Sequence, residues 1–216
     1  MGLTRTEEAG ERVRLFTPAA GVRLAFADRR VVALDVEADR YVRLSRAISK
    51  PVGEAMAAPA LAGPVAALAS AGLLKAPASV SRNLYASHLG QNRLQANRIA
   101  GVIGACAWAA RKLRKLRFCE VLSAVKLPRA SARPASAMEA IVCGFLAARP
   151  LYPRDYECFF DALALRHYLA RRGYAVSWVF GVRGAPFAAH CWLEFDGVVL
   201  NDDPDIVHAY RPIMVV

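Results

Sequence analysis

The stretch that decides the fold runs from residue 187 to residue 205 and reads FAAHCWLEFDGVVLNDDPD. Its first nine residues have the composition of a strand, and Asp196-Gly197 is a strong hairpin signal before the valines that follow. Side chains along a strand point alternately to its two faces, so His190, Trp192 and Glu194 share one face. The opposite face is apolar and is the predicted core face, made of Ala189, Cys191, Leu193 and Phe195.

The register of this hairpin determines which acid lies across from His190. With a three-residue loop, Phe195 to Gly197, Asp202 lies opposite His190 on the same face. With a two-residue loop, Asp203 lies there instead. Cross-strand Cβ atoms are about 5 Å apart, which lets a carboxylate hydrogen-bond an imidazole. The sequence therefore predicts a histidine–carboxylate pair and leaves Asp202 and Asp203 both open.

A cysteine lies at the start of the helix that precedes these strands. Asp155 is the predicted N-cap of a helix that runs to about Arg172, with Gly173 as its C′ residue. Cys158 then falls in the first turn, where unpaired N–H groups and the positive end of the helix dipole favour a thiolate. Packing in the core is the usual role of a single cysteine. Together with His190 and an acid, however, Cys158 completes a set of nucleophile, base and orienting acid.

The rest of the chain divides into segments of different pattern. Residues 1–20 are polar and predicted to be flexible. Residues 21–77 predict a three-stranded meander followed by helices, which is a small winged-helix-like domain. Residues 78–135 predict a helical connector, and residues 136–216 a domain in which the cysteine helix packs on an antiparallel sheet, so the fold class is α+β. The individual predicted elements are strands at 22–27, 31–34, 41–44, 174–182, 187–195 and 198–202, and helices at 99–125 and 136–148.

Charge and composition limit the functions that are possible. The formal net charge is +11, which suits an acidic partner. The basic residues are scattered except at 111–117, where we expect a solvated helix face. The chain has neither an aromatic platform nor a basic arm beside a recognition helix, so we expect no nucleic-acid partner.

The five cysteines form no CxxC pair, and no compact set of ligands predicts a metal site. The longest apolar run, at 99–110, is shorter than the roughly 20 residues that span a bilayer. The first fourteen residues lack the apolar segment of a signal peptide. Free thiols persist in a reducing compartment, so we expect a cytoplasmic protein with no membrane span.

Three segments taken together resemble a known family. They are YECFFDALAL at 156–165, FGVRGAPFAAHCWLE at 180–194 and VLNDDPD at 199–205. Over roughly residues 140–216 they resemble the leader peptidases of bacterial lasso-peptide biosynthesis, the B proteins of those pathways, which are transglutaminase-like cysteine proteases with a papain-like site. The resemblance implies a C-terminal papain/transglutaminase-like domain whose triad is Cys158, His190 and Asp202.

The N-terminal part resembles the peptide-recognition domain of the fused members of that family. The resemblance implies that a precursor's leader peptide adds a strand beside residues 41–44 and leans on the helix around 61–74. It also implies a partner, an ATP-dependent macrolactam synthetase of the same pathway, and no cofactor for this chain. The implied leader-binding residues are Tyr41, Val42, Arg43, Leu44, Leu61, Val65 and Leu68.

Two alternatives to a peptidase stay open on the sequence. A transglutaminase-type acyltransferase would use the same three residues, with an amine in place of water as the acceptor. A non-catalytic scaffold that binds the precursor would not need Cys158 at all. The acyl-enzyme is common to the first alternative and the peptidase, so residue types alone do not separate them.

Overall fold

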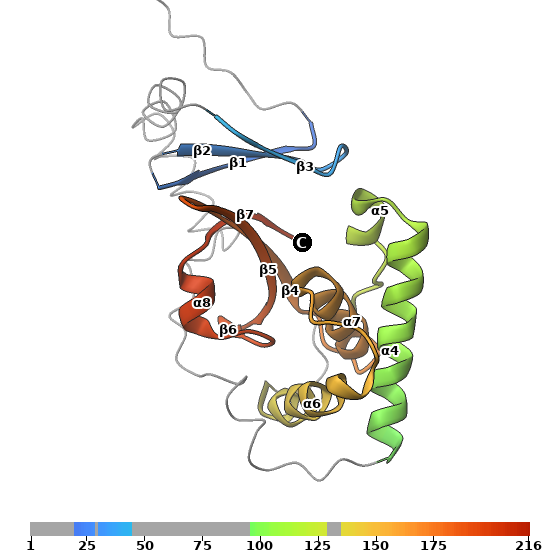
Figure 1. The fold of residues 1–216 in the computed structure, drawn as a ribbon. Helices are drawn as coiled ribbons and strands as arrows, with labels where there is room; N and C mark the ends of the chain where they lie inside the picture. The colour runs from blue at the N-terminus through green and yellow to red at the C-terminus, as the bar shows by residue number, and fades with distance from the viewer. Residues whose placement is uncertain (1–19, 29, 45–95, 129–134) are drawn as a thin grey trace, which may run out of the picture.

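The computed structural model describes residues 20–28, 30–44, 96–128 and 135–216. Within them lie two antiparallel sheets, one of three strands and one of four, and a group of helices beside the larger sheet (Figure 1). The predicted helices that follow the first sheet, with Leu61, Val65 and Leu68, lie outside the described residues, as do residues 1–19.

The smaller sheet is an up-and-down meander, as the sequence predicts. Its strands are β1 (Val22–Ala27), β2 (Arg30–Asp35) and β3 (Arg40–Arg43), in the order β1-β2-β3. Aspartates make both turns: Asp28 and Asp39 adopt positive φ, which aspartate tolerates better than most residues. In the second turn, the side chain of Asp35 also accepts hydrogen bonds from two backbone N–H groups that follow it.

The larger sheet has the strand order β6-β5-β4-β7, and all its pairs are antiparallel. Strand β5 has the predicted bounds, whereas β4 begins three residues later than predicted and β6 has only two residues. The strands are β4 (Ser177–Gly184), β5 (Phe187–Phe195), β6 (Val198–Val199) and β7 (Arg211–Val215).

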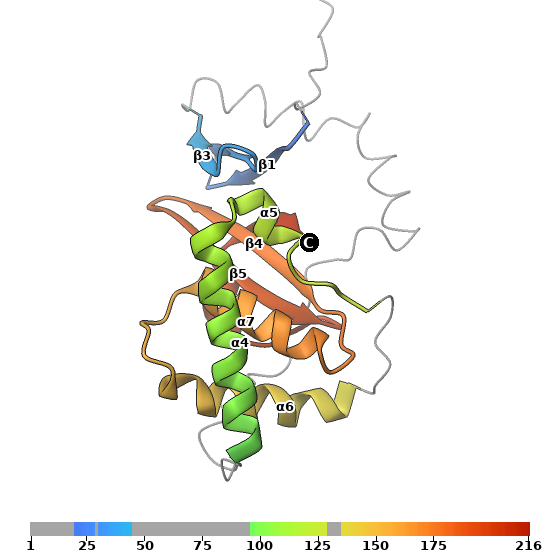
Figure 2. The ribbon, with the colours of Figure 1, turned by 90° about the vertical axis from the view of Figure 1, so that its right-hand side faces the viewer.

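One face of this sheet is covered by α7 (Cys158–Ala170), with α4 (Ala96–Lys115) and α6 (Ala135–Ala148) outside it (Figure 2). Most of α7 is buried, as expected for a helix that is apolar on nearly every side. On the opposite face, α8 (Pro204–His208) contributes to a second, smaller apolar cluster. The α+β class is thus observed for the described residues, with α4 and α7 in one core.

The predicted helix over 99–125 is divided into two. Helix α4 ends at Lys115, and α5 (Phe118–Leu122) begins three residues later. At the break, the Arg117 N–H donates to the side chain of Glu120 at 2.7 Å. A glutamate three residues into a helix commonly caps the helix start in this way, so the Glu120 side chain provides a local reason for a new start.

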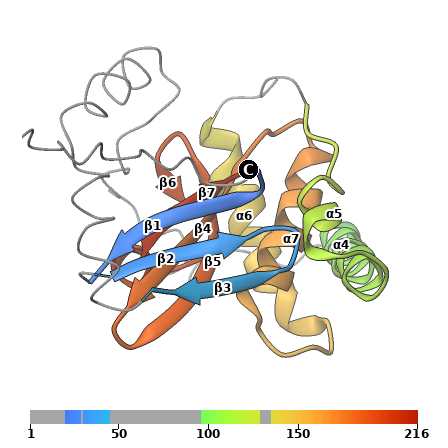
Figure 3. The ribbon, with the colours of Figure 1, turned by 90° about the horizontal axis from the view of Figure 1, so that it is seen from above.

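The two sheets are in contact through a turn of each. The Asp28 carboxylate accepts hydrogen bonds from the N–H groups of Gly184 (2.8 Å) and Ala185 (3.0 Å), at the turn between β4 and β5. A Cβ at Gly184 would collide with the carbonyl of Ala27, so only glycine permits this approach. Seen from above, the smaller sheet lies across the end of the larger one (Figure 3).

Candidate active site

Cys158 is the first residue of α7, a helix that is mostly buried and apolar. The N-cap is Glu157, in an extended conformation and without a side-chain cap, so the prediction of Asp155 as N-cap is wrong. The physical reason lies in Arg149, whose guanidinium binds the carbonyls of the loop from residue 152 to residue 155 and holds that loop extended. Cys158 keeps the predicted place in the first turn, near the positive end of the helix dipole.

An ion pair beneath the cysteine holds the start of α7. Arg149 follows α6 in a short 3-10 helix (Arg149–Leu151), is only 1% exposed and pairs with Asp161 one turn into α7. The second carboxylate oxygen of Asp161 accepts the Glu157 N–H at 2.9 Å, which satisfies the backbone at the helix start. Sequence reasoning missed this pair, although an acid inside the apolar run FFDALAL is a usable signal for a buried partner.

His190 lies on β5, opposite Gly181 of β4. Its ring stands between two aromatic rings, with centroid distances of 6.0 Å to Trp192 and 5.1 Å to Tyr210. Gly181 makes this packing possible, because a Cβ there would come within 2.8 Å of Trp192 and 2.9 Å of Tyr210. The Nε2 atom of His190 is hydrogen-bonded to Asp202, so Nδ1 is the nitrogen left for the cysteine.

The side chain of Asn201 ends the strand pairing and so decides whether Asp202 or Asp203 contacts His190. Glu194 pairs with Val199, so the loop has two residues, the register that would place Asp203 opposite His190. The predicted strand to residue 202 is shorter than expected, however, because the Asn201 side chain accepts the Leu193 N–H at 2.8 Å. The backbone turns away there and Asp202 meets His190.

Asp203 has a different position in the structure. It is the N-cap of α8, and its carboxylate accepts the Asp205 N–H at 2.9 Å. An aspartate before a proline at the helix start is a common N-terminal arrangement. The structure therefore brings Asp202 to His190 and gives Asp203 to a helix cap.

Cys158 and His190 each shift the pKa of the other so that both are charged. A hydrogen bond from the Cys191 thiol, helped by one from His190, lowers the pKa of Cys158 to about 4 despite burial. Burial by itself lowers the pKa of His190, but hydrogen bonds with Asp202 and Cys158 raise it to about 9. Between these two values the site holds a thiolate beside an imidazolium.

Cys191 does more than fill the core. It is 2% exposed, as predicted for the core face. Burial, followed by the neighbouring Cys158, raises the pKa of Cys191 well above its ordinary value, so Cys191 stays a thiol and can donate to the thiolate. Ala189, by contrast, was predicted on the core face and is exposed, as are Phe187 and the turn before it, so the buried part of β5 begins only at Cys191.

The smaller sheet reaches the site through Tyr41. Tyr41 pairs with the fully buried Leu34 on β2, so its side chain lies on the inner face of the sheet, with its ring centroid 5.9 Å from that of Phe187. Burial, then the charges of Cys191, Asp39 and Cys158, raise the pKa of Tyr41 to about 12. Of the other expected leader-binding residues, Val42 and Arg43 are exposed and Leu44 is half-buried.

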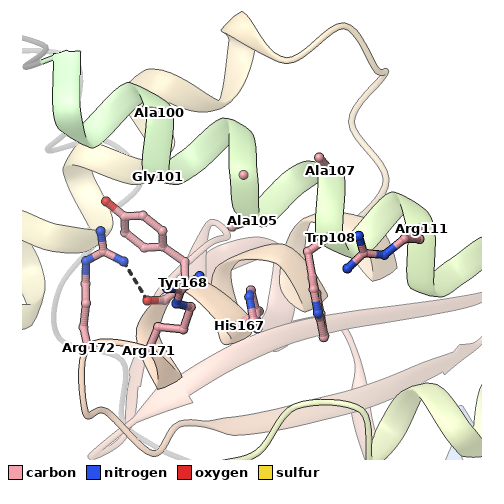
Figure 4. A pocket seen from close by; sticks show the side chains of 11 residues that line it. Ala100, Gly101, Ala105, Ala107, Trp108, Arg111, His167, Tyr168, Arg171 and Arg172 are labelled. Atoms are coloured by element: carbon pink, nitrogen blue, oxygen red, sulfur yellow. Dashed lines mark hydrogen bonds between the residues drawn. The ribbon is translucent and has the colours of Figure 1, made fainter.

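A second concave region is separate from this site. It lies between α4 and α7, is lined by residues such as Trp108 and His167, and contains none of the residues described above (Figure 4). In the described parts of the chain, no group of three or more histidine, cysteine or acidic side chains could hold a metal ion. None of the helices described is long and apolar enough to cross a membrane.

A thiolate at the start of a buried helix, facing a histidine–aspartate pair on an antiparallel sheet, is the arrangement of a papain-type thiol enzyme. The chain belongs to the transglutaminase-like superfamily: the model of that family matches residues 100–215, from α4 to β7. Domains of this family are usually cysteine-dependent enzymes. Neither the curated proteins nor the solved structures contain a significant match to the chain.

Proposed function

We propose that this protein is a cysteine peptidase that removes the leader peptide from a ribosomally made lasso-peptide precursor. The cleavage precedes macrolactam formation by a partner, an ATP-dependent synthetase. The proposal rests on the sequence resemblance and on one observation of the structure. That observation is the packing of β3 on β5, the strand that carries His190, through the contact between the rings of Tyr41 and Phe187.

In the proposed reaction, Cys158 is the nucleophile, His190 the acid and base, and Asp202 the group that orients His190. The Cys158 thiolate attacks the carbonyl carbon at the junction of leader and core. The His190 imidazolium gives its proton to the leaving amine, which becomes the N-terminus of the released core peptide. Water then attacks the thioester with His190 as base, which releases the leader as a carboxylic acid.

The start of α7 supports the charge that develops during the attack. The N–H groups of its first turn have no acceptor within the helix and lie at the positive end of the helix dipole. They are suited to bind the oxyanion of the tetrahedral intermediate. The buried pair of Arg149 and Asp161 keeps this turn in place, so that it need not reorganise during the reaction.

The leader would bind by adding a strand to β3. Among the described strands, β3 is at the edge of its sheet, so its outer backbone groups are available for such pairing. Val42 and Arg43 are exposed and can contact the side chains of the added strand. Because the Tyr41 ring of the same strand packs on Phe187 of β5, a leader held on β3 would lie close to the strand that carries His190.

The test is mass spectrometry of the cognate precursor after incubation with the protein, the synthetase and ATP. We expect wild-type protein to release an intact leader and Cys158→Ala to release none. Cys143→Ala is the matched control, because Cys143 is a buried cysteine of α6 and is not among the residues of the site. If Cys158→Ala cleaves as well as wild type, the peptidase proposal is wrong and the chain is better seen as a precursor-binding scaffold.

The same experiment separates the peptidase from an acyltransferase. The family name makes acyl transfer the second candidate, since both reactions pass through the same thioester. With an added primary amine, a transferase yields an amide of the acyl group, whereas a peptidase yields mainly the acid. A predominance of the amide product would overturn the peptidase assignment and retain the proposed roles of the three residues.

A further inference from the structure

The region between α4 and α7 is a groove with a volume of about 640 Å³. Its floor is made by small residues of α4, of which Ala100, Gly104 and Ala107 are exposed on one side of the helix. No atom lies within 4 Å of the position that a Gly104 Cβ would take, so the floor is open there. Small residues at helical spacing let a second helix approach closely, because side chains at the contact set the distance between helix axes.

The aromatic side chains of the groove are held by their neighbours. Trp108 stacks on His167, with ring centroids 3.9 Å apart and planes 5° from parallel, and Lys112 lies 5.6 Å above the Trp108 ring. Arg172 lies over the Tyr168 ring at 3.4 Å and donates to the Tyr168 carbonyl at 2.9 Å. The ring faces that a nucleotide base would stack on are therefore occupied, and the wall of the groove is preformed (Figure 4).

The charged side chains among the described lining residues of the groove are all positive. Arg111, Arg171 and Arg172 line it, and none of the described lining residues is acidic. Burial lowers the pKa of both His167 and Arg172. The positive charge of Arg171 also lowers both pKa values, although Tyr168 opposes the shift at Arg172. Part of this charge faces the negative end of the α7 dipole. In the part of the chain that the structure describes, no carboxylate lines the groove beside these three guanidinium groups, so an occupant with carboxylates would relieve their repulsion.

We propose that the groove between α4 and α7 is a docking site for an acidic helix of a partner protein. The length of the floor fits about three helical turns, since residues 100 to 111 of α4 span roughly 17 Å. The occupant lays its small or apolar face on Ala100, Gly104 and Ala107, and its glutamates or aspartates meet the arginines at the rim. This site is on α4, outside the residues that carry the peptidase proposal, and does not depend on it.

The experiment uses the full chain and two synthetic peptides of equal composition. The first is a stapled helix of about 18 residues with its glutamates on one face, and the second has the same residues scrambled around the helix. Binding is measured by fluorescence anisotropy at about 50 mM and about 200 mM salt, since salt screens charge pairs at the surface. We expect the patterned peptide to bind at least about tenfold more tightly than the scrambled one at both salt concentrations.

Variants of the chain locate the binding. Gly104→Leu fills the floor, and because its Cβ meets no atom, the variant is expected to fold with unchanged or raised thermal stability. It should weaken binding of the patterned peptide at least about tenfold. Arg111→Glu should weaken it more than Arg114→Glu, which makes the same charge change on the same helix but outside the groove.

Other results would overturn the proposal. Equal affinity for the two peptides, or equal losses in Arg111→Glu and Arg114→Glu, would mean that the peptide responds only to net charge. Unchanged binding in Gly104→Leu would exclude the floor as the contact. Displacement of the patterned peptide by inorganic phosphate at about 1 mM would identify a small-anion site in place of a helix-binding groove.

Discussion

The two sheets of this protein differ in how their polar groups are used. In the larger sheet, α7 and the segments next to them, three pairs of largely buried polar groups join specific partners: Cys158 with His190, His190 with Asp202, and Arg149 with Asp161. In the three-stranded sheet, most charged side chains are exposed, and the larger sheet is contacted by apolar residues of β1 and β2 as well as by Asp28 and Tyr41. From this difference we expect the larger sheet and α7 to determine reactivity, and the smaller sheet to affect which substrates reach the site.

The largest expected effect comes from Asp202, the proposed orienting acid. Asp202→Asn leaves the shape of the site intact but removes the charge that holds the His190 imidazolium. By analogy with the acid of serine triads, we expect a loss in kcat of up to about 10⁴-fold with any substrate. Asp203→Asn is the matched control, because Asp203 caps α8. A loss with Asp203→Asn as large as with Asp202→Asn would contradict the assignment.

The buried ion pair at the start of α7 is the next largest effect. Arg149→Met leaves Asp161 buried without its partner, so we expect the free energy of unfolding to fall by about 3–5 kcal/mol. Arg117→Met, which breaks the exposed pair with Glu120, should cost less than about 1 kcal/mol. Urea denaturation of both variants gives the two values. Equal costs would show that the helix start does not depend on the pair.

The pH dependence of the reaction follows from the two shifted pKa values. The thiolate is lost as pH falls through about 4, and the imidazolium is lost as pH rises through about 9. We therefore expect kcat/KM to be flat between these limits and to fall about tenfold per pH unit beyond each. In Cys158→Ala, the pKa of His190 measured by NMR should be lower than in wild type, because the thiolate that favours the imidazolium is absent.

A smaller effect is expected where the sheets meet, and it should depend on the substrate. Asp28→Asn weakens the bonds to Gly184 and Ala185, which are charge-assisted, by about 1–2 kcal/mol. We expect a higher KM for the full precursor and an unchanged kcat/KM for a short peptide that contains only the cleavage site. Asp35→Asn is the control, since Asp35 bonds only within its own turn. A loss with the short peptide as well would mean that the smaller sheet shapes the reacting groups themselves.

Tyr41→Phe should have the smallest effect of the five. The pKa of about 12 keeps the Tyr41 phenol neutral at working pH, so its removal takes no charge from the site. The ring contact with Phe187 remains in the variant. We expect kcat to change less than about tenfold in steady-state assays, the scale of a single hydrogen bond. A larger loss would mean that Tyr41 takes part in the reaction itself.

Much of the fold could be predicted from local sequence. The meander from Val22 onward and the bounds of β5 follow from strand composition and turn residues, which act over a few positions. Cys158 at a helix start also followed from local signals. What failed depended on individual side-chain contacts that residue periodicity does not encode: the guanidinium of Arg149 displaced the expected cap at Asp155, and Glu120 interrupted the long helix.

The acid that contacts His190 shows even more clearly what local sequence could not predict. Register arithmetic on the hairpin connects His190 with Asp202 or Asp203 by assuming that the strand continues. The observed two-residue loop favours Asp203 by that arithmetic, yet the Asn201 side chain ends the ladder and Asp202 makes the contact. Only the resemblance to a family named Asp202 in advance. A side chain that substitutes for a backbone acceptor leaves no periodic signal in the sequence.

The contact between Asp28 and the β4–β5 turn joins positions 156 residues apart in the chain. Ribosomes add roughly 5–20 residues per second, so the first sheet emerges roughly 8–30 s before the hairpin that it rests on. Throughout that interval, Val32 and Leu34, which are fully buried in the finished molecule, lack the cover of β4. The first sheet to be synthesised is therefore among the last parts to be completed, and its exposure during translation is set by the length of chain that separates it from residue 184.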